Sequence, residues 1–183
     1  ESAGARSTPL FVNFLVTKRD ALKDIPGLDS VRIPESQSAV ARLASRNPLA
    51  STICSRDEDG CVVFSVNRAG DEAGSDLELQ EAIAVDFLAC HAPKAASALA
   101  GLAAQSGVSL RVLMVNPFGC ECKTPTGQNA LPAPGQLNSA MVWESLDDVV
   151  ERSFRWKARV RLRRLGIAAA LLLALITVLG PVT

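Results

Sequence analysis

The stretch that decides the fold is IAVDFLACHAPKAASALAGLAAQSGVSLRVLMV, residues 83–115. Its first six residues alternate enough for a strand, although residues 77–88 are also compatible with a helix. Pro93 then stands at a first helical position before an alanine-rich run, and Gly107 ends that helix. Residues 108–115 are rich in β-branched and apolar side chains and predict a second strand. We therefore expect a strand–helix–strand unit, which favours parallel pairing with a right-handed crossover.

The residues before this unit predict more strands and one helix. LFVNFLV at residues 10–16 indicates a strand, and residues 35–46 indicate a helix that closes before Pro48. Residues 51–55 and 61–66 flank the acidic loop RDEDG and predict a β-hairpin. We expect a soluble α/β body over residues 1–115, built on a small mixed or parallel sheet.

The C-terminal stretch GIAAALLLALITVLGPVT, residues 166–183, is uncharged and apolar on all sides. Its 18 residues would extend about 27 Å as a helix, close to the hydrocarbon thickness of a bilayer. The alternative is a buried core helix, which a strongly basic flank disfavours. The expectation is one C-terminal transmembrane helix within residues 145–183, with Ser145 as its N-cap.

Charge is distributed unevenly along a chain whose 19 basic and 19 acidic residues cancel. Residues 1–150 hold 12 basic and 18 acidic side chains, a net charge of −6, whereas residues 151–165 hold seven basic side chains and one acid. By the positive-inside rule, the body is expected on the stromal or matrix side of an organellar membrane. Trp156 could instead pack against the domain. The residues predicted to flank the membrane anchor are Phe154, Arg155, Trp156, Lys157, Arg159, Arg161, Arg163 and Arg164.

Residues 116–144 read as an extended segment rich in proline and glycine, without a regular element. Ordering such a chain costs roughly 1–2 kcal/mol per residue, so something must hold it. It could wrap its own domain or lie on a neighbouring subunit. Phe118, Leu131 and Leu137 are the side chains best suited to contact a partner.

The five cysteines leave three interpretations open. Cys54 and Cys61 flank the hairpin loop and could form a disulfide or redox pair, and Cys120 and Cys122 could join Cys90 and His91 in a metal site. All five could equally be structural thiols, because cysteine is a common small buried residue.

Several functional classes are disfavoured by the sequence. The acidic body argues against a nucleic-acid partner, and no glycine-rich phosphate-binding motif occurs. Cys90 and His91, the only adjacent thiol and imidazole, would point to opposite faces of a strand. Asp57 and Asp59 sit in a turn with no apolar pocket to raise a pKa. We expect no enzymatic activity, no catalytic or metal-binding residues and no intrinsic cofactor, although a peripheral pigment or lipid contact is compatible with the sequence.

The chain begins at Glu1 without a methionine, as it would after removal of a transit peptide. Together with the predicted anchor, this suggests a non-catalytic accessory subunit of a large organellar energy-converting membrane complex. A thylakoid photosystem–antenna supercomplex of the chloroplast is the favoured context, and a mitochondrial inner-membrane respiratory or ATP-synthase assembly is the alternative. Partners would be other subunits and the lipid bilayer. The rival hypothesis is a membrane-tethered thiol or metal oxidoreductase that uses the cysteines.

Overall fold

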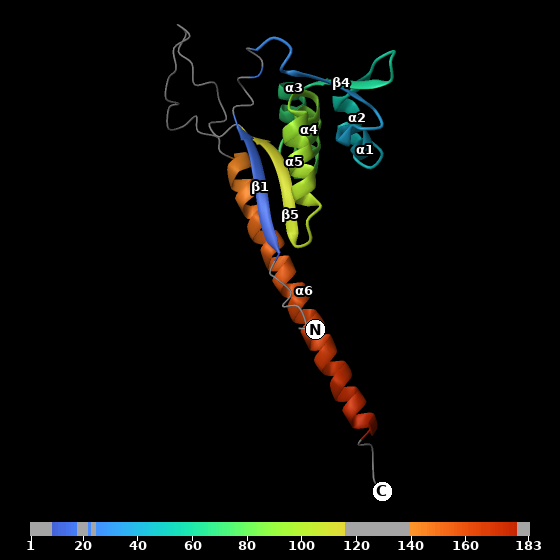
Figure 1. The fold of residues 1–183 in the computed structure, drawn as a ribbon, viewed down its shortest axis with the longest axis vertical. Coiled ribbons are helices and arrows are strands. Elements are labelled where there is room, and N and C mark those ends of the chain that lie inside the picture. Colours follow the sequence, from blue (N-terminus) through green and yellow to red (C-terminus); the bar gives the residue numbers. More distant parts are fainter. Residues whose placement is uncertain (1–8, 18–21, 23–24, 116–139, 179–183) are drawn as a thin grey trace. The chain divides into compact units, whose positions relative to one another are not determined.

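The structure is a computed structural model that describes residues 9–17, 22, 25–115 and 140–178, drawn as a ribbon in Figure 1. The chain divides into two compact units, Glu1–Leu146 and Asp147–Thr183. In chain order, the helices and strands of the described residues are β1 (Leu10–Thr17), β2 (Ser30–Pro34), α1 (Ala39–Ala44), α2 (Pro48–Ile53), β3 (Ser55–Arg56), β4 (Cys61–Ser65), α3 (Val66–Ala73), α4 (Leu77–His91), α5 (Pro93–Ala103), β5 (Val108–Val115) and α6 (Ala140–Val178).

The first sheet pairs the strands β1 and β5, which lie side by side in Figure 1. They run parallel, and the register matches Leu10 with Val108 and Val16 with Met114. Helices α4 and α5 both pack against β5. The predicted strands at residues 10–16 and 108–115 are therefore confirmed, and so is the helix that begins at Pro93.

Helix α4 corrects the expected strand–helix–strand unit, because residues 83–88 lie inside it rather than in a strand. Asp76 caps the helix, with its carboxylate accepting hydrogen bonds from the backbone of Glu78 and Leu79, each at 3.1 Å. The helix contacts α1, α3, α5, β2 and β5, so it buries side chains around most of its circumference. An apolar run of this kind reads the same in sequence as a buried strand. The parallel partner of β5 is thus the distant strand β1.

The second sheet is antiparallel, with the strand order β2–β4–β3. Its β3–β4 hairpin has the predicted acidic loop, in which Gly60 takes a positive φ of 74°. The first hairpin strand is shorter than expected, because residues 51–53 belong to α2. Pro48, expected to close a helix, instead opens α2 at its first turn, and the side chain of Asn47 accepts from the Leu49 backbone at 3.0 Å.

The outer edge of β2 is covered by the C-terminal end of α4. The Cys90 thiol donates to the carbonyl oxygen of Arg32 at 3.7 Å, and the His91 Nε2–H donates to that of Ser30 at 2.9 Å. Pro34, which has no N–H, completes this strand. These contacts occupy carbonyls that would otherwise be open to another strand. Cys90 and His91 therefore act here as side chains that seal a sheet edge.

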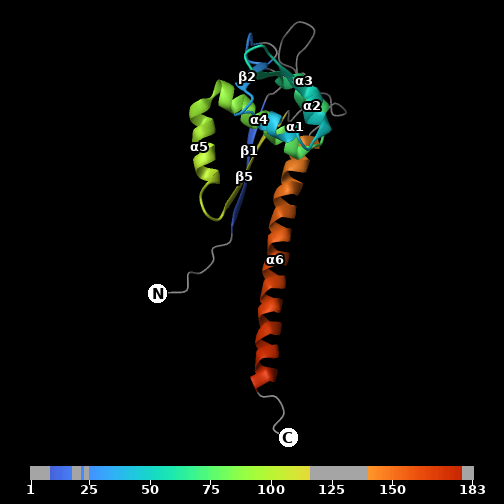
Figure 2. The same cartoon turned by 90° about the vertical axis from the view of Figure 1, so that its right-hand side faces the viewer.

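Helix α1 is shorter than the predicted helix over residues 35–46 and covers only its middle. Val40 and Leu43 are its buried residues, three positions apart as expected for an amphipathic helix. Together with Val31, Leu79 and Ile83, they belong to the hydrophobic core of the first unit. Figure 2 shows α1 next to α4, which it contacts.

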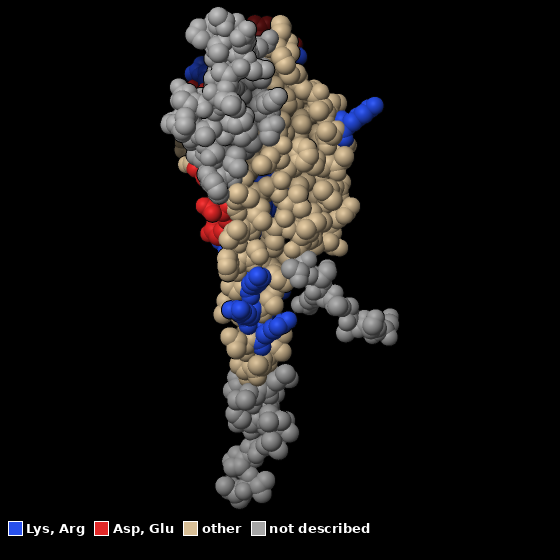
Figure 3. All heavy atoms as spheres, turned by 90° about the vertical axis from the view of Figure 1, so that its left-hand side faces the viewer, with Lys and Arg blue, Asp and Glu red and all other residues tan. Residues whose placement is uncertain are grey.

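The second unit consists of the greater part of α6. This helix begins at Ala140, so Ser145 is not its N-cap. The predicted anchor residues lie on it: Phe154 is 66% exposed, with the Lys157 ammonium 6.0 Å from its ring centre, and Arg155 forms an ion pair with Glu151 one turn away. Figure 3 shows basic side chains gathered along one stretch of the helix.

The expected transmembrane helix is contradicted. Within the part of the chain that the structure describes, no helix is both long enough and apolar enough to cross a bilayer. In α6 the uncharged residues begin only after Arg164 and continue to Val178, whereas a span needs roughly 20. Extending the window backwards includes Arg161, Arg163 and Arg164. The expected organellar membrane localisation, in the thylakoid or elsewhere, is overturned by the same finding, and the photosynthetic context that depended on it has no support.

Candidate functional site

A row of side chains on α4 separates two hollows on the surface of the first unit. Glu81, Val85 and Leu88 follow each other at spacings of four and three residues and share one face of the helix. One hollow lies on each side of this row, and Glu81 and Val85 line both of them. The two hollows therefore adjoin along α4 and together make up the candidate site, with Val85 between them.

The apolar pocket, on the side of α5 and β5, has a volume of about 160 Å³. Leu88 and Val112 are buried, while Leu99 and Leu110 pack against the core from partly exposed positions. Glu81 is the charged residue among those that line it. The described residues that line it are Glu81, Val85, Leu88, Ala96, Leu99, Ala100, Ala103, Leu110 and Val112.

The alanines of α5 explain why this space is not filled. Ala96, Ala100 and Ala103 recur at spacings of four and three residues, so they share the face that lines the pocket. Their single methyl groups leave room beside Leu99 that a larger residue would occupy. No residue of α5 is fully buried, which fits a helix that packs loosely over β5. The pocket is a direct consequence of the small residues in this sequence.

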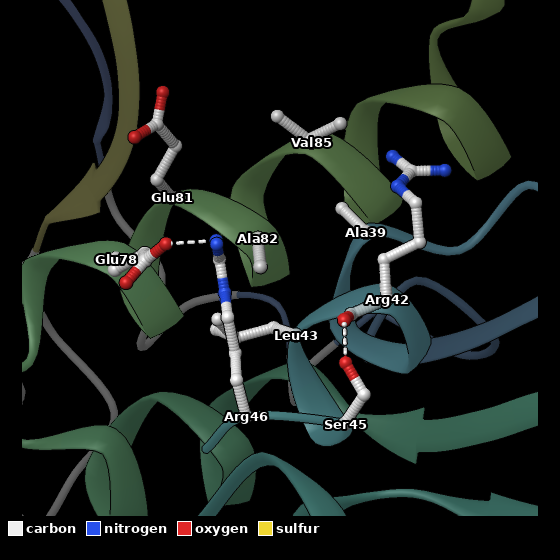
Figure 4. Close-up of a pocket in the computed structure, with 9 residues that line it drawn as sticks. All are labelled: Ala39, Arg42, Leu43, Ser45, Arg46, Glu78, Glu81, Ala82 and Val85. Atoms are coloured by element: carbon white, nitrogen blue, oxygen red, sulfur yellow. Dashed lines mark hydrogen bonds and ion pairs between the residues drawn. The ribbon is translucent and has the colours of Figure 1, made fainter.

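The charged groove, on the side of α1, has a volume of about 500 Å³ and is open to solvent. Figure 4 shows Arg46, in the turn after α1, reaching Glu78 of α4, with which it forms an ion pair. Glu81 is engaged with Arg111 of β5, at 3.1 Å between Nε and Oε2. Among the residues that the structure describes, the groove is lined by Ala39, Arg42, Leu43, Ser45, Arg46, Glu78, Glu81, Ala82 and Val85.

Arg42 differs from the other charged residues of the groove. Its guanidinium donates to the backbone carbonyl of Gln37 at 3.2 Å, and among the described residues it forms no ion pair with a carboxylate. In Figure 4 its side chain extends at the opposite end of the groove from Glu78 and Glu81. The groove therefore offers an exposed cation that a bound carboxylate can reach.

Asp86 fixes α1 against α4 and so sets the geometry of the groove. Its carboxylate accepts hydrogen bonds from the Ser38 hydroxyl at 2.6 Å and from the backbone N–H groups of Ala39 at 2.6 Å and Val40 at 3.1 Å. Burial raises the pKa of Asp86 above its ordinary value, although these three bonds oppose the shift. Asp86 is fully buried, so it positions a helix and does not meet a ligand.

The cysteines that the structure describes lie outside both hollows. Cys54, Cys61 and Cys90 are free cysteines in the structure, and the possible pairing of Cys54 with Cys61 stays a hypothesis. Burial raises the pKa of the Cys54 thiol, which lowers its thiolate fraction and its reactivity. No group of three or more potential metal ligands occurs among the described residues. Cys120 and Cys122 lie outside them.

Of the sequence-based site residues that the structure describes, none is among those that line the two hollows. Phe118, Leu131 and Leu137, predicted to contact a partner, lie outside the described residues. The basic flank lies on α6, in the second unit. The sequence did not indicate the hollows beside Glu81 and Val85, because residues 83–88 of α4 were compatible with a strand as well as with a helix. The spacing of Glu81, Val85 and Leu88 would have indicated a shared helical face.

No known protein family, curated protein or solved structure matches this chain.

Proposed function

We propose that the chain is a non-catalytic accessory subunit that binds another protein through the apolar pocket and the charged groove on α4. The apolar pocket is the observation that carries this proposal. Its volume of about 160 Å³ is below the roughly 300–1,000 Å³ of sites for drug-sized ligands and cofactors. It is close to the roughly 150 Å³ of an apolar cavity that holds a single benzene ring. This size suits one apolar side chain.

The surroundings of the pocket also support protein binding. Interfaces combine a buried apolar anchor with a polar rim, and a few anchors supply most of the binding energy. Here the apolar pocket would receive the anchor, and the charged groove beyond Val85 would form the rim. The charges that surround the pocket are positioned by ion pairs between separate elements, so the rim is largely formed before binding.

A pair of matched substitutions tests the proposal. Ala100→Leu places a larger side chain in the apolar pocket, whereas Ala98→Leu makes the same change on an exposed position of α5 that does not line it. Alanine and leucine have similar helix propensities, so both variants should fold. On native gels of extracts from the cells that make the protein, wild type and Ala98→Leu should migrate as one assembly well above 19.3 kDa. Ala100→Leu should be absent from that assembly. Equal migration of the two variants would contradict the proposal.

A further inference from the structure

The charges of the groove identify the kind of segment that fits it. Two of its charged side chains, Arg46 and Glu78, neutralise each other across the groove. Glu81 is neutralised from outside the groove by Arg111. Arg42 then remains as a positive charge without a carboxylate partner among the described residues. A negatively charged group is therefore favoured at this end of the groove.

Resting on the proposed function, we propose that the site binds a short acidic segment of a partner protein. One apolar side chain of that segment enters the apolar pocket, and one carboxylate pairs with Arg42. Val85 lies between the two positions, because it lines both hollows. A guanidinium holds a carboxylate through two parallel hydrogen bonds, which gives directional recognition as well as charge.

A basic segment is excluded by the same charges. Its ammonium or guanidinium groups would face Arg42, and the carboxylates of Glu78 and Glu81 are already engaged. A purely apolar segment would fill the pocket but leave the cation without a partner. Recognition should therefore require the apolar and acidic groups together, with the charge contributing to specificity more than to affinity.

Buried Asp86 does not compete for Arg42. Its carboxylate is fully engaged by Ser38 and by two backbone N–H groups at the start of α1. The positive charge of Arg42 acts on Asp86 through space and opposes the rise in the pKa of Asp86. Arg42 itself is exposed at the protein surface and can turn toward a bound carboxylate.

Synthetic peptides provide the probe. Each carries one leucine and one glutamate, about one or about two helical turns apart, in an otherwise alanine-rich chain. Matched peptides replace the glutamate by lysine or the leucine by alanine. Binding to the protein is followed by the amide chemical shifts of Val85 and Leu99, which line the pocket, in wild type, Ala98→Leu, Ala100→Leu and Arg42→Gln.

We expect at least one leucine–glutamate peptide to shift both amides in wild type and Ala98→Leu. Its affinity should fall about tenfold or more in Ala100→Leu, where the anchor is blocked, and several-fold in Arg42→Gln. Equal binding of the lysine peptide would overturn the acidic specificity. Binding that neither substitution weakens, or the absence of binding by every peptide at millimolar concentration, would overturn the proposal.

These results separate the two proposals. If Ala100→Leu is absent from the native assembly but no acidic peptide binds, the pocket contacts a partner segment that is not acidic. In that case only the proposal of an acidic segment fails. If Ala100→Leu assembles as Ala98→Leu does, the proposed function itself fails.

Discussion

The hydroxyl of Ser38 donates a hydrogen bond of 2.6 Å to the carboxylate of Asp86, and both side chains are fully buried. The same hydroxyl accepts from the backbone N–H of Ala41 at 3.0 Å, as an N-cap does. Asp86 thus ties the start of α1 to the middle of α4. One wall of the charged groove depends on this contact.

Asp86→Asn should destabilise the protein by roughly 1–3 kcal/mol, because one carboxylate oxygen that accepts backbone hydrogen bonds becomes an amide donor. Ser38→Ala should cost about 1 kcal/mol through the lost cap and hydrogen bond. Urea denaturation measures both values. The two residues share one network, so the double variant should lose less than the sum of the single variants. Simple additivity would contradict the network.

The pH dependence of stability should differ between wild type and Asp86→Asn. The pKa of Asp86 is raised in the folded state, so the folded protein binds this proton more tightly than the unfolded chain does. The contribution of Asp86 to the stability of the folded state is therefore fully present below the ordinary pKa of an aspartate carboxyl. It is lost as the pH rises through the raised pKa of the folded state. Denaturation at several pH values should show the stability of wild type, relative to the variant, falling with rising pH. A rise would contradict this sign.

Asp57 should show the opposite behaviour. Its carboxylate accepts from the Cys61 backbone at 2.8 Å and pairs with Arg32 at 2.7 Å, and the Cys61 bond is the larger cause that lowers its pKa. Its stabilising effect is present above the ordinary pKa and is lost as the pH falls through the lowered value. Titration of the Asp57 carboxyl by NMR in Arg32→Gln should give a pKa that rises but stays below the ordinary value. A complete return to the ordinary value would show that the ion pair dominates.

Two glycine substitutions should have opposite effects. Gly101 lies within α5, and an added Cβ there would meet no atom within 4 Å, so Gly101→Ala should stabilise the protein by about 0.5–1 kcal/mol. Gly74 ends α3 with φ 52° and ψ −123°, a conformation that side chains disfavour, so Gly74→Ala should destabilise it by about 1–3 kcal/mol. Thermal unfolding measures both, and equal effects would contradict the assignment of strain to Gly74.

The sequence predicted those elements whose signals are local. Residues 108–115 and the helix after Pro93 carry clear propensities, and Gly60 marks the turn of the hairpin. Pro48 was misread because a proline can follow one helix and open the next, and the cap at Asn47 decides between these. Residues 83–88 were misread because burial around most of α4 weakens the periodicity that identifies a helix.

The candidate site could not be predicted from local patterns. Its apolar pocket arises where α4, α5 and β5 meet, and alanines on α5 form a hollow only because of that packing. The special position of Arg42 likewise follows from how the other charges pair, which only the fold determines. The membrane prediction failed for a different reason: it counted apolar residues from 166 to 183, whereas the uncharged part of the described helix ends at Val178.

Site-specific photocrosslinking tests the central claim, that the apolar pocket on α4 binds a partner protein, most directly. A photoreactive side chain is introduced at Ala100, which lines the pocket, and at Ala98, which does not. The probe at Ala100 should crosslink in cells to one partner polypeptide, at an acidic segment, and Arg42→Gln should weaken this product. The probe at Ala98 should give no such product. Equal crosslinking from the two positions, or none from Ala100, would contradict the claim.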